Sequence, residues 1–248
     1  MAEVDEKPTA AVAAEVGEDD DDDAPKLSAR ALEALKEFLA GQQLSGVPTG
    51  GEDEEEGAGA GSGAAEEVRL VSEDWGLSQF WYDRETAETV AAEVVRLCAA
   101  AGSLVACVAC PTLYAYLKKK DPSMSAQLLE YDRRFERYGG DFVFYDYNQP
   151  GDLPSKMHHA YGVVVADPPY LSKECLEKVA QTISFLARPQ ESYILLLTGE
   201  VQMDIAAELL DVHPCGFRPQ HTSKLGNEFR LFTNYNPKER LGGWQQDA

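Results

Sequence analysis

Short apolar runs alternate with amphipathic segments along most of the chain after residue 68, and this alternation constrains the fold more than any other feature. The run at residues 104–109 is continuously apolar, which is typical of a strand buried on both faces. Further strands are expected at residues 127–132, 142–146, 161–166 and 192–197. Helices are expected at residues 111–120 and 173–188, from Asp83 or Thr86 to residue 101, and from Thr198 or Gly199 to residue 210. Such alternation predicts a mostly parallel sheet with helices on both faces.

The end of the chain departs from this alternation. Residues 215–219 and 228–234 are two more strand candidates, and no helical pattern separates them. We therefore expect two closing strands after the last helix.

Acidic side chains are concentrated before residue 68. The first 67 residues hold 19 acidic and four basic side chains, whereas the remainder holds 24 and 18. We expect a disordered acidic tail over residues 1–26, an amphipathic helix over 27–40 and a flexible linker rich in Gly and Glu over 41–67. A domain at 68–236 and a C-terminal tail at 237–248 complete the predicted organisation. The net charge of −21 and the lack of a basic stripe argue against a protein that grips nucleic acid.

Other classes of protein are excluded on composition. The acidic start lacks the pattern of a secretory signal. The longest uncharged stretch, residues 97–117, is too weakly apolar and too interrupted to predict a membrane span. Five cysteines without framework spacing indicate a reducing compartment, and we expect a cytoplasmic monomer. Cys107 and Cys110 are interpreted as buried strand residues and no metal site is expected, because no second cysteine pair follows.

One motif directly follows the apolar run at residues 161–166: Asp167, Pro168, Pro169 and Tyr170. The Asp167 carboxylate and the free Pro168 carbonyl are hydrogen-bond acceptors, and consecutive prolines fix the turn. Tyr170 adds an aromatic wall. Rigid acceptors beside a ring suit an amino group, because they take its N–H bonds and direct its lone pair elsewhere.

Here the sequence resembles known enzymes. Asp-Pro-Pro-Tyr after an apolar strand resembles motif IV of the S-adenosylmethionine-dependent amino-methyltransferases. Residues 75–82 (WGLSQFWY), 130–135 (EYDRRF), 142–148 (FVFYDYN) and 227–230 (NEFR) are similar to the elongation factor 1-alpha lysine methyltransferase family, once described as N6-adenine DNA methyltransferases. The resemblance covers roughly residues 27–40 and 68–236. It implies the α/β class I methyltransferase (Rossmann-like) fold: a seven-stranded, mostly parallel sheet with an antiparallel last strand.

The resemblance also implies residue roles. Asp132 would accept hydrogen bonds from the ribose hydroxyls of S-adenosylmethionine, with Glu130 as the fallback, and Asp146 would lie near the adenine amino group. A segment that closes over the methionine end of the cofactor would contain Trp75, Gln79, Phe80 and Trp81. The sequence departs from the family of folds after the first strand, where residues 109–112 (ACPT) replace a Gly-rich loop.

The target amine would be held by the Asp-Pro-Pro-Tyr motif. Asp167 and the carbonyl of Pro168 would accept its N–H bonds, Pro169 would fix the turn, and Tyr170 would line the channel. The same resemblance implies a protein substrate, elongation factor 1-alpha, rather than nucleic acid or a membrane.

Three functions remain open on the sequence. A protein-lysine N-methyltransferase is favoured. An adenine N6-methyltransferase would use the same motif, with Tyr170 stacked on a flipped base, but it is disfavoured by the charge. A non-catalytic nucleotide-binding module is disfavoured by the complete motif.

Overall fold

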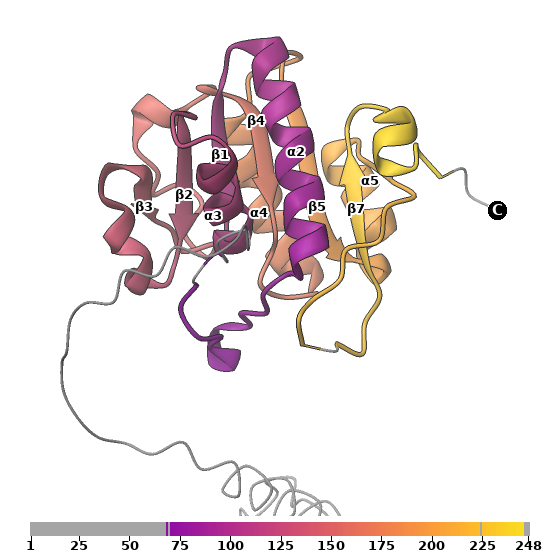
Figure 1. Cartoon of the computed structure of the whole chain (residues 1–248), viewed down its shortest axis with the longest axis horizontal. Helices are drawn as coiled ribbons and strands as arrows, with labels where there is room; N and C mark the ends of the chain where they lie inside the picture. Colours follow the sequence, from indigo (N-terminus) through magenta and orange to yellow (C-terminus); the bar gives the residue numbers. More distant parts are fainter. Residues whose placement is uncertain (1–67, 69, 224, 246–248) are drawn as a thin grey trace, which may run out of the picture. The chain divides into compact units, whose positions relative to one another are not determined.

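The protein was analysed as a computed structural model, which describes residues 68, 70–223 and 225–245 (Figure 1). The acidic tail, the amphipathic helix at 27–40 and the linker predicted before residue 68 lie outside the described residues.

A seven-stranded sheet with the order β3-β2-β1-β4-β5-β7-β6 forms the centre of the domain. All neighbouring strands from β3 to β5 are parallel, and β7 is antiparallel to both of its neighbours. The strands are β1 (Leu104–Val108), β2 (Ala126–Glu130), β3 (Phe142–Phe144), β4 (Tyr161–Ala166), β5 (Tyr193–Gly199), β6 (His213–Pro214) and β7 (Phe229–Thr233). The predicted fold class is confirmed.

Two helices cover each face of this sheet. Helices α2 (Arg84–Ala101) and α3 (Pro111–Lys120) lie in front of it in Figure 1, and α4 (Lys173–Leu186) lies behind it with α5 (Met203–Leu210). Alternate residues of β1 divide between the two layers: Val105 and Cys107 pack toward α2 and α3, whereas Ala106 and Val108 pack toward α4. Because both faces of the sheet are covered, the central strands β1 and β4 are apolar, as the sequence predicted.

Local signals set the ends of the helices. The Asp83 carboxylate accepts a hydrogen bond from the backbone N–H of Thr86 and caps the start of α2. Gly102 ends α2 with a φ of 56°, a left-handed conformation that glycine adopts without strain. The Ser172 hydroxyl caps α4 in the same way as Asp83 caps α2. Short 3-10 helices η1 (Trp75–Leu77), η2 (Arg133–Asp141), η3 (Ser155–Met157), η4 (Glu200–Gln202) and η5 (Lys238–Leu241) occupy the connections.

The strand order reverses between β1 and β4, which are neighbours in the sheet but distant in sequence. A crevice forms at such a switch point, because the connections from the two strands leave toward opposite faces. The carboxyl ends of β1, β2 and β4 therefore define one edge of the sheet. The segment that contains η1 and the loop before β7 both reach this edge, at the bottom of Figure 1.

Several boundaries differ from the prediction, including the end of β5 at Gly199 and the start of α5 at Met203. Strands β2 and β3 end two residues earlier than expected, at Glu130 and Phe144. The sixth strand is His213–Pro214 instead of residues 215–219. The residues after Pro214 pair with the end of the chain instead, because Gly216 N–H donates to Gly243 O at 2.9 Å and Phe217 N–H donates to Leu241 O at 2.9 Å. Leu241 is buried in the core, so residues expected to form a C-terminal tail pack against the domain.

Candidate functional site

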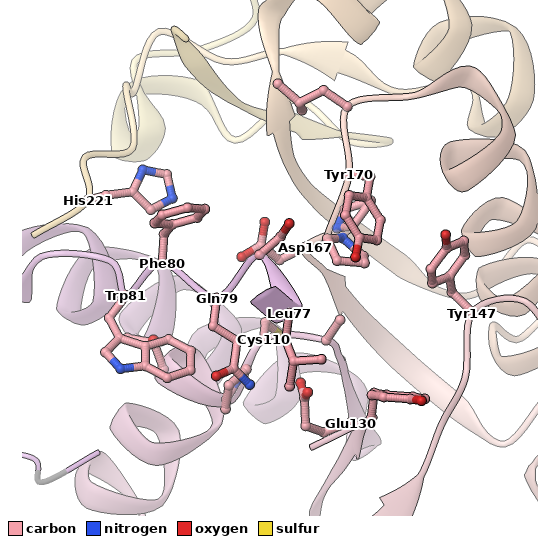
Figure 2. A pocket seen from close by; sticks show the side chains of 18 of the residues that line it. Leu77, Gln79, Phe80, Trp81, Cys110, Glu130, Tyr147, Asp167, Tyr170 and His221 are labelled. Carbon is pink, nitrogen blue, oxygen red and sulfur yellow. The ribbon is translucent and has the colours of Figure 1, made fainter. Parts of the chain in front are cut away.

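A cavity of about 640 Å³ opens where β1, β2 and β4 end (Figure 2). Its size lies within the range of small-molecule sites. One wall comes from the strand ends and includes Glu130 and Asp167. The opposite wall comes from residues 77–82, which begin at the last residue of η1, and from residues of the loop between β6 and β7, including His221.

The two covering segments are hydrogen-bonded to each other although they are about 140 residues apart in sequence. Asp83 N–H donates to Gln220 O at 2.9 Å, and Thr222 N–H donates to Trp81 O at 2.8 Å. The rings of Tyr82 and His221 stack between these bonds, with centroids 4.4 Å apart. This pairing fixes residues 80–83 over the cavity.

Asp167 follows the last residue of β4 and faces the cavity (Figure 2). Its backbone N–H donates to Val108 O at 3.0 Å, which anchors the turn to β1. The carboxylate Oδ1 accepts the Tyr82 hydroxyl at 2.9 Å, and no ion pair among the described residues includes Asp167. Burial raises the pKa of Asp167 to about 8; the Tyr82 hydrogen bond opposes the rise and the charge of Glu130 adds to it. The motif therefore presents a carboxylate that lacks a cation.

Glu130 is the last residue of β2 and is buried at the cavity wall. Its Oε1 accepts the backbone N–H of Asp132 at 3.0 Å. Burial raises the pKa of Glu130 to about 7, and the charge of Asp132 adds to the rise, whereas hydrogen bonds from the backbone of Asp132 and Tyr131 and from the Gln79 side chain oppose it. This carboxylate, like that of Asp167, lies beside the cavity without a cation.

Asp132, the first-choice ribose acceptor of the sequence analysis, is not among the residues that line the cavity, and its role stays a prediction. Arg134 pairs with its carboxylate at 2.6 Å, and the Gln79 amide donates to it at 3.0 Å. It also caps η2 through the backbone N–H of Arg134. Burial alone would raise the pKa of Asp132, but these hydrogen bonds hold it below its ordinary value. The strand ends at Glu130, so the fallback residue is the one that reaches the cavity.

Residues after β3 and β4 form an aromatic side of the cavity. Asp146 lines it, as expected, and its carboxylate also accepts the backbone N–H of Asn148 at 2.8 Å. The rings of Tyr147 and Tyr170 lie 5.9 Å apart, and both line the cavity together with Pro168 and Pro169 (Figure 2). All four residues of the Asp-Pro-Pro-Tyr motif are therefore at the site.

The predicted closing segment divides into two groups. Gln79, Phe80 and Trp81 line the cavity, whereas Trp75 does not and is 60% exposed. The amide of Gln79 is engaged with Arg134 and Asp132, and the Trp81 indole donates to Val71 O at 2.9 Å. These bonds hold the segment in place over the site.

The turn after β1 and the start of α3 also line the cavity, through Ala109, Cys110, Pro111 and Thr112. Ala109 has a φ of 53°, a conformation that glycine would adopt without strain. The chain thus follows a path that suits glycine and keeps a small side chain there, which leaves the loop backbone accessible from the cavity.

Tyr82 and His221 are site residues that the sequence analysis missed. Tyr82 stood in a recognised aromatic stretch, but nothing in that stretch indicated a bond to Asp167. No signal pointed to His221, because its place depends on a contact between distant segments. Burial lowers the pKa of His221 to about 4, so its ring is neutral near pH 7.

The described residues contain neither a candidate membrane span nor a candidate metal site. None of their helices is long and apolar enough to cross a membrane. Nor do these residues contain a group of three or more His, Cys, Asp or Glu side chains that could hold a metal ion.

Comparison with known proteins identifies relatives of the chain. Residues 73–237 match the family described as "Probable N6-adenine methyltransferase". The "EEF1A lysine methyltransferase 1" of Bos taurus is 46% identical over 86% of this chain and 88% of its own length. The protein of the same name from Homo sapiens is 44% identical over 88% of this chain and 95% of its own. This chain belongs to that methyltransferase family.

A less similar relative and a solved structure were also found. A protein-lysine N-methyltransferase of Caenorhabditis elegans is 37% identical over 87% of this chain and 96% of its own length. Among solved structures, a SAM-dependent methyltransferase from Aquifex aeolicus aligns with a TM-score of 0.39 at 13% identity, over 61% of this chain and 93% of that chain. The family assignment rests on the curated relatives, and the resemblance predicted from the sequence is confirmed.

Proposed function

We propose that this protein is an S-adenosylmethionine-dependent lysine N-methyltransferase that acts on translation elongation factor 1-alpha. The observation that carries the proposal is the cation-free carboxylate of Asp167 beside the two prolines and Tyr170 on one cavity wall. The names of the curated relatives supply the substrate. All five cysteines are free and buried, which suits a reducing compartment such as the cytoplasm.

The residues around the cavity fit S-adenosylmethionine. Glu130 offers a buried carboxylate at the end of β2, which suits the two ribose hydroxyls of a nucleoside. Asp146, after β3, is an acceptor for an adenine amino group. The loop of small residues at 109–112 and the half-buried rings of Phe80 and Trp81 enclose the remaining space. When bound, this cofactor supplies an electrophilic methyl group.

Asp167 acts on the other reactant. A lysine side chain has an ordinary pKa near 10.4, so the ammonium must release a proton to solvent before its nitrogen can attack. The Asp167 carboxyl group, which is ionised above about pH 8, and the Pro168 carbonyl then accept the N–H bonds of the neutral amine, which orients the lone pair. Tyr147 and Tyr170 flank the apolar stem of the lysine and exclude water.

The charge of the domain favours a basic protein surface over nucleic acid. Residues 68–248 hold 24 acidic and 18 basic side chains, whereas phosphate binding needs several free Lys or Arg contacts. Two arginines that follow β2 already form ion pairs within the protein: Arg134 pairs with Asp132, and Arg133 pairs with Glu136 at 2.5 Å.

The test is to incubate the protein with S-[methyl-3H]adenosylmethionine and purified elongation factor 1-alpha, alongside total RNA and DNA. The products are hydrolysed and separated as amino acids and nucleosides. We expect label in methyl-lysine with the parent and none with Asp167→Asn. Label in N6-methyladenosine or its deoxy form, with none in methyl-lysine, would contradict the proposal and favour the adenine reaction.

A further inference from the structure

The Asp167 side chain is fixed by one hydrogen bond that comes from a distant part of the chain. The Tyr82 hydroxyl donates to Oδ1 of Asp167 at 2.9 Å. Within the described part of the chain, this is the one side-chain hydrogen bond that Asp167 makes, and Oδ2 has no such partner. Tyr82 is 3% exposed and directly precedes Asp83, the residue that caps α2. The position of the Tyr82 hydroxyl relative to the turn after β4 is therefore fixed.

His221 limits the freedom of the Tyr82 ring. The two residues form an antiparallel backbone bridge, and their rings stack with centroids 4.4 Å apart. On the other side of His221, the Phe229 ring lies edge-on at 4.5 Å. Tyr82 thus cannot turn its hydroxyl away from Asp167 without losing its stack on the His221 ring.

We propose that Tyr82 is a positioning residue for methyl transfer: it holds one oxygen of Asp167 so that the other oxygen faces the target amine, and His221 fixes the Tyr82 ring. This inference rests on the proposed function, in which Asp167 holds the amine. In this proposal Tyr82 acts on the reaction through Asp167.

The same bond favours the ionised carboxylate. The titratable groups that face Asp167 are Tyr82 and His221 from the covering segments, Cys110 from the loop after β1, Glu130 from β2 and Tyr170 from its own turn. None of them supplies a positive charge near pH 7, because burial keeps His221 neutral. The Tyr82 hydroxyl is thus the donor that offsets the cost of burying the Asp167 charge.

The decisive variant is Tyr82→Phe, which removes the hydroxyl and keeps the ring. The chain provides a matched control in Tyr114→Phe. The Tyr114 hydroxyl also donates to a carboxylate oxygen, Asp141 Oδ2, at a distance of 2.8 Å, and neither residue lines the cavity. The full-length proteins are labelled with 13C at the Asp carboxyl carbons, and Asp167 is titrated by NMR without cofactor or substrate. The Asp167 signal is assigned from its loss in Asp167→Asn.

In Tyr82→Phe we expect the titration midpoint of Asp167 to rise by about one to two pH units, because a carboxylate loses a charge-assisted hydrogen bond. In Tyr114→Phe it stays where the parent has it. The acid limb of the kcat profile should move to higher pH by the same amount, with the KM for S-adenosylmethionine within about twofold of the parent.

An Asp167 midpoint in folded Tyr82→Phe equal to that of the parent overturns the proposal. If the midpoint shifts but the parent fails to methylate elongation factor 1-alpha, the proposed substrate fails and the Tyr82–Asp167 coupling stands. Should Tyr82→Phe not fold, His221→Ala replaces it, with a smaller rise of the midpoint expected and an unchanged midpoint again contradicting the proposal.

Discussion

Two carboxylates that are two residues apart, Glu130 and Asp132, occupy opposite electrostatic environments. Glu130 lines the cavity without a cation, and burial raises its pKa to about 7. Asp132 lies outside the cavity lining, pairs with Arg134 at 2.6 Å, and has a pKa below its ordinary value. Glu130 therefore can accept hydrogen bonds from a ligand in the cavity, whereas the Asp132 carboxylate is already bonded to Arg134 and Gln79.

The difference shows how a binding carboxylate can be separated from a structural one. A buried charge without a partner destabilises the apo protein, so it persists where a ligand uses it. A buried charge with a cation and several donors needs no ligand. By this criterion Asp167 belongs with Glu130, and Glu93, which pairs with Arg96 and Arg240, belongs with Asp132.

The largest effect is expected for Asp167→Asn. The amide keeps the shape of the side chain but removes the charge that holds the amine, so turnover should fall about 100-fold or more. The dissociation constant of S-adenosylmethionine, measured by calorimetry, should stay within about threefold of the parent. Asp141→Asn is the control, because Asp141 lies outside the cavity lining, and it should keep nearly full turnover. Equal turnover in the two variants would place Asp167 with the structural carboxylates.

A smaller effect is expected for Asp132→Asn, and it should fall on stability. Loss of the charge weakens the bonds from Arg134, Gln79 and the start of η2. Arg134 is partly exposed to solvent, so we expect a loss of about 1–2 kcal/mol in the free energy of unfolding, measured by urea denaturation. Arg133→Ala, which breaks an exposed pair with Glu136, should cost less. A larger loss of unfolding free energy in Arg133→Ala than in Asp132→Asn would contradict the structural role given to Asp132.

The last expected effect concerns the pH dependence of stability. Glu130 and Asp167 keep their protons to about pH 7 and 8 in the folded protein, whereas the unfolded chain releases them near pH 4. The folded state therefore binds more protons over this range, and stability falls as pH rises toward 8. Asp132, with its lowered pKa, contributes stability that is lost only as pH falls below about 4.

The thermal midpoint of the full chain, measured from pH 6.5 to 8, tests this sign. His221 is neutral in both states over most of that range, so it adds little. We expect the midpoint to fall with pH in the parent and in Asp132→Asn, and to fall less in Glu130→Gln. Parallel curves for the parent and Glu130→Gln would show that Glu130 has an ordinary pKa.

Much of the fold could be predicted from the sequence because its signals are local. The continuous apolar strands, the Asp-Pro-Pro-Tyr turn and the Gly102 helix end each depend on a few neighbouring residues. The sixth strand was misplaced because its pairing is not local: two residues of β6 bond to β7, and the apolar residues after Pro214 bond to the chain end.

The site was predicted less completely for the same reason. Glu130 and Asp132 are two residues apart and would face the same side of an extended chain, so the preference for Asp132 came from the resemblance and not from the residue pattern. The two carboxylates differ because Arg134 and Gln79 both donate to Asp132, and Gln79 is 53 residues away from Asp132 in sequence. The Tyr82–Asp167 bond spans 85 residues and had no local signal.

The central claim is that the cation-free carboxylate at the end of β2 binds the cofactor and the ion-paired one beside it does not. The most direct test is calorimetric titration of S-adenosylmethionine into Glu130→Gln and Asp132→Asn in parallel at pH 8, where Glu130 is ionised. A charged acceptor to a ribose hydroxyl contributes about 1.5–3 kcal/mol, so the dissociation constant should rise about tenfold or more in Glu130→Gln. In Asp132→Asn it should stay within about threefold of the parent. A tenfold loss in Asp132→Asn with parental affinity in Glu130→Gln would contradict the account.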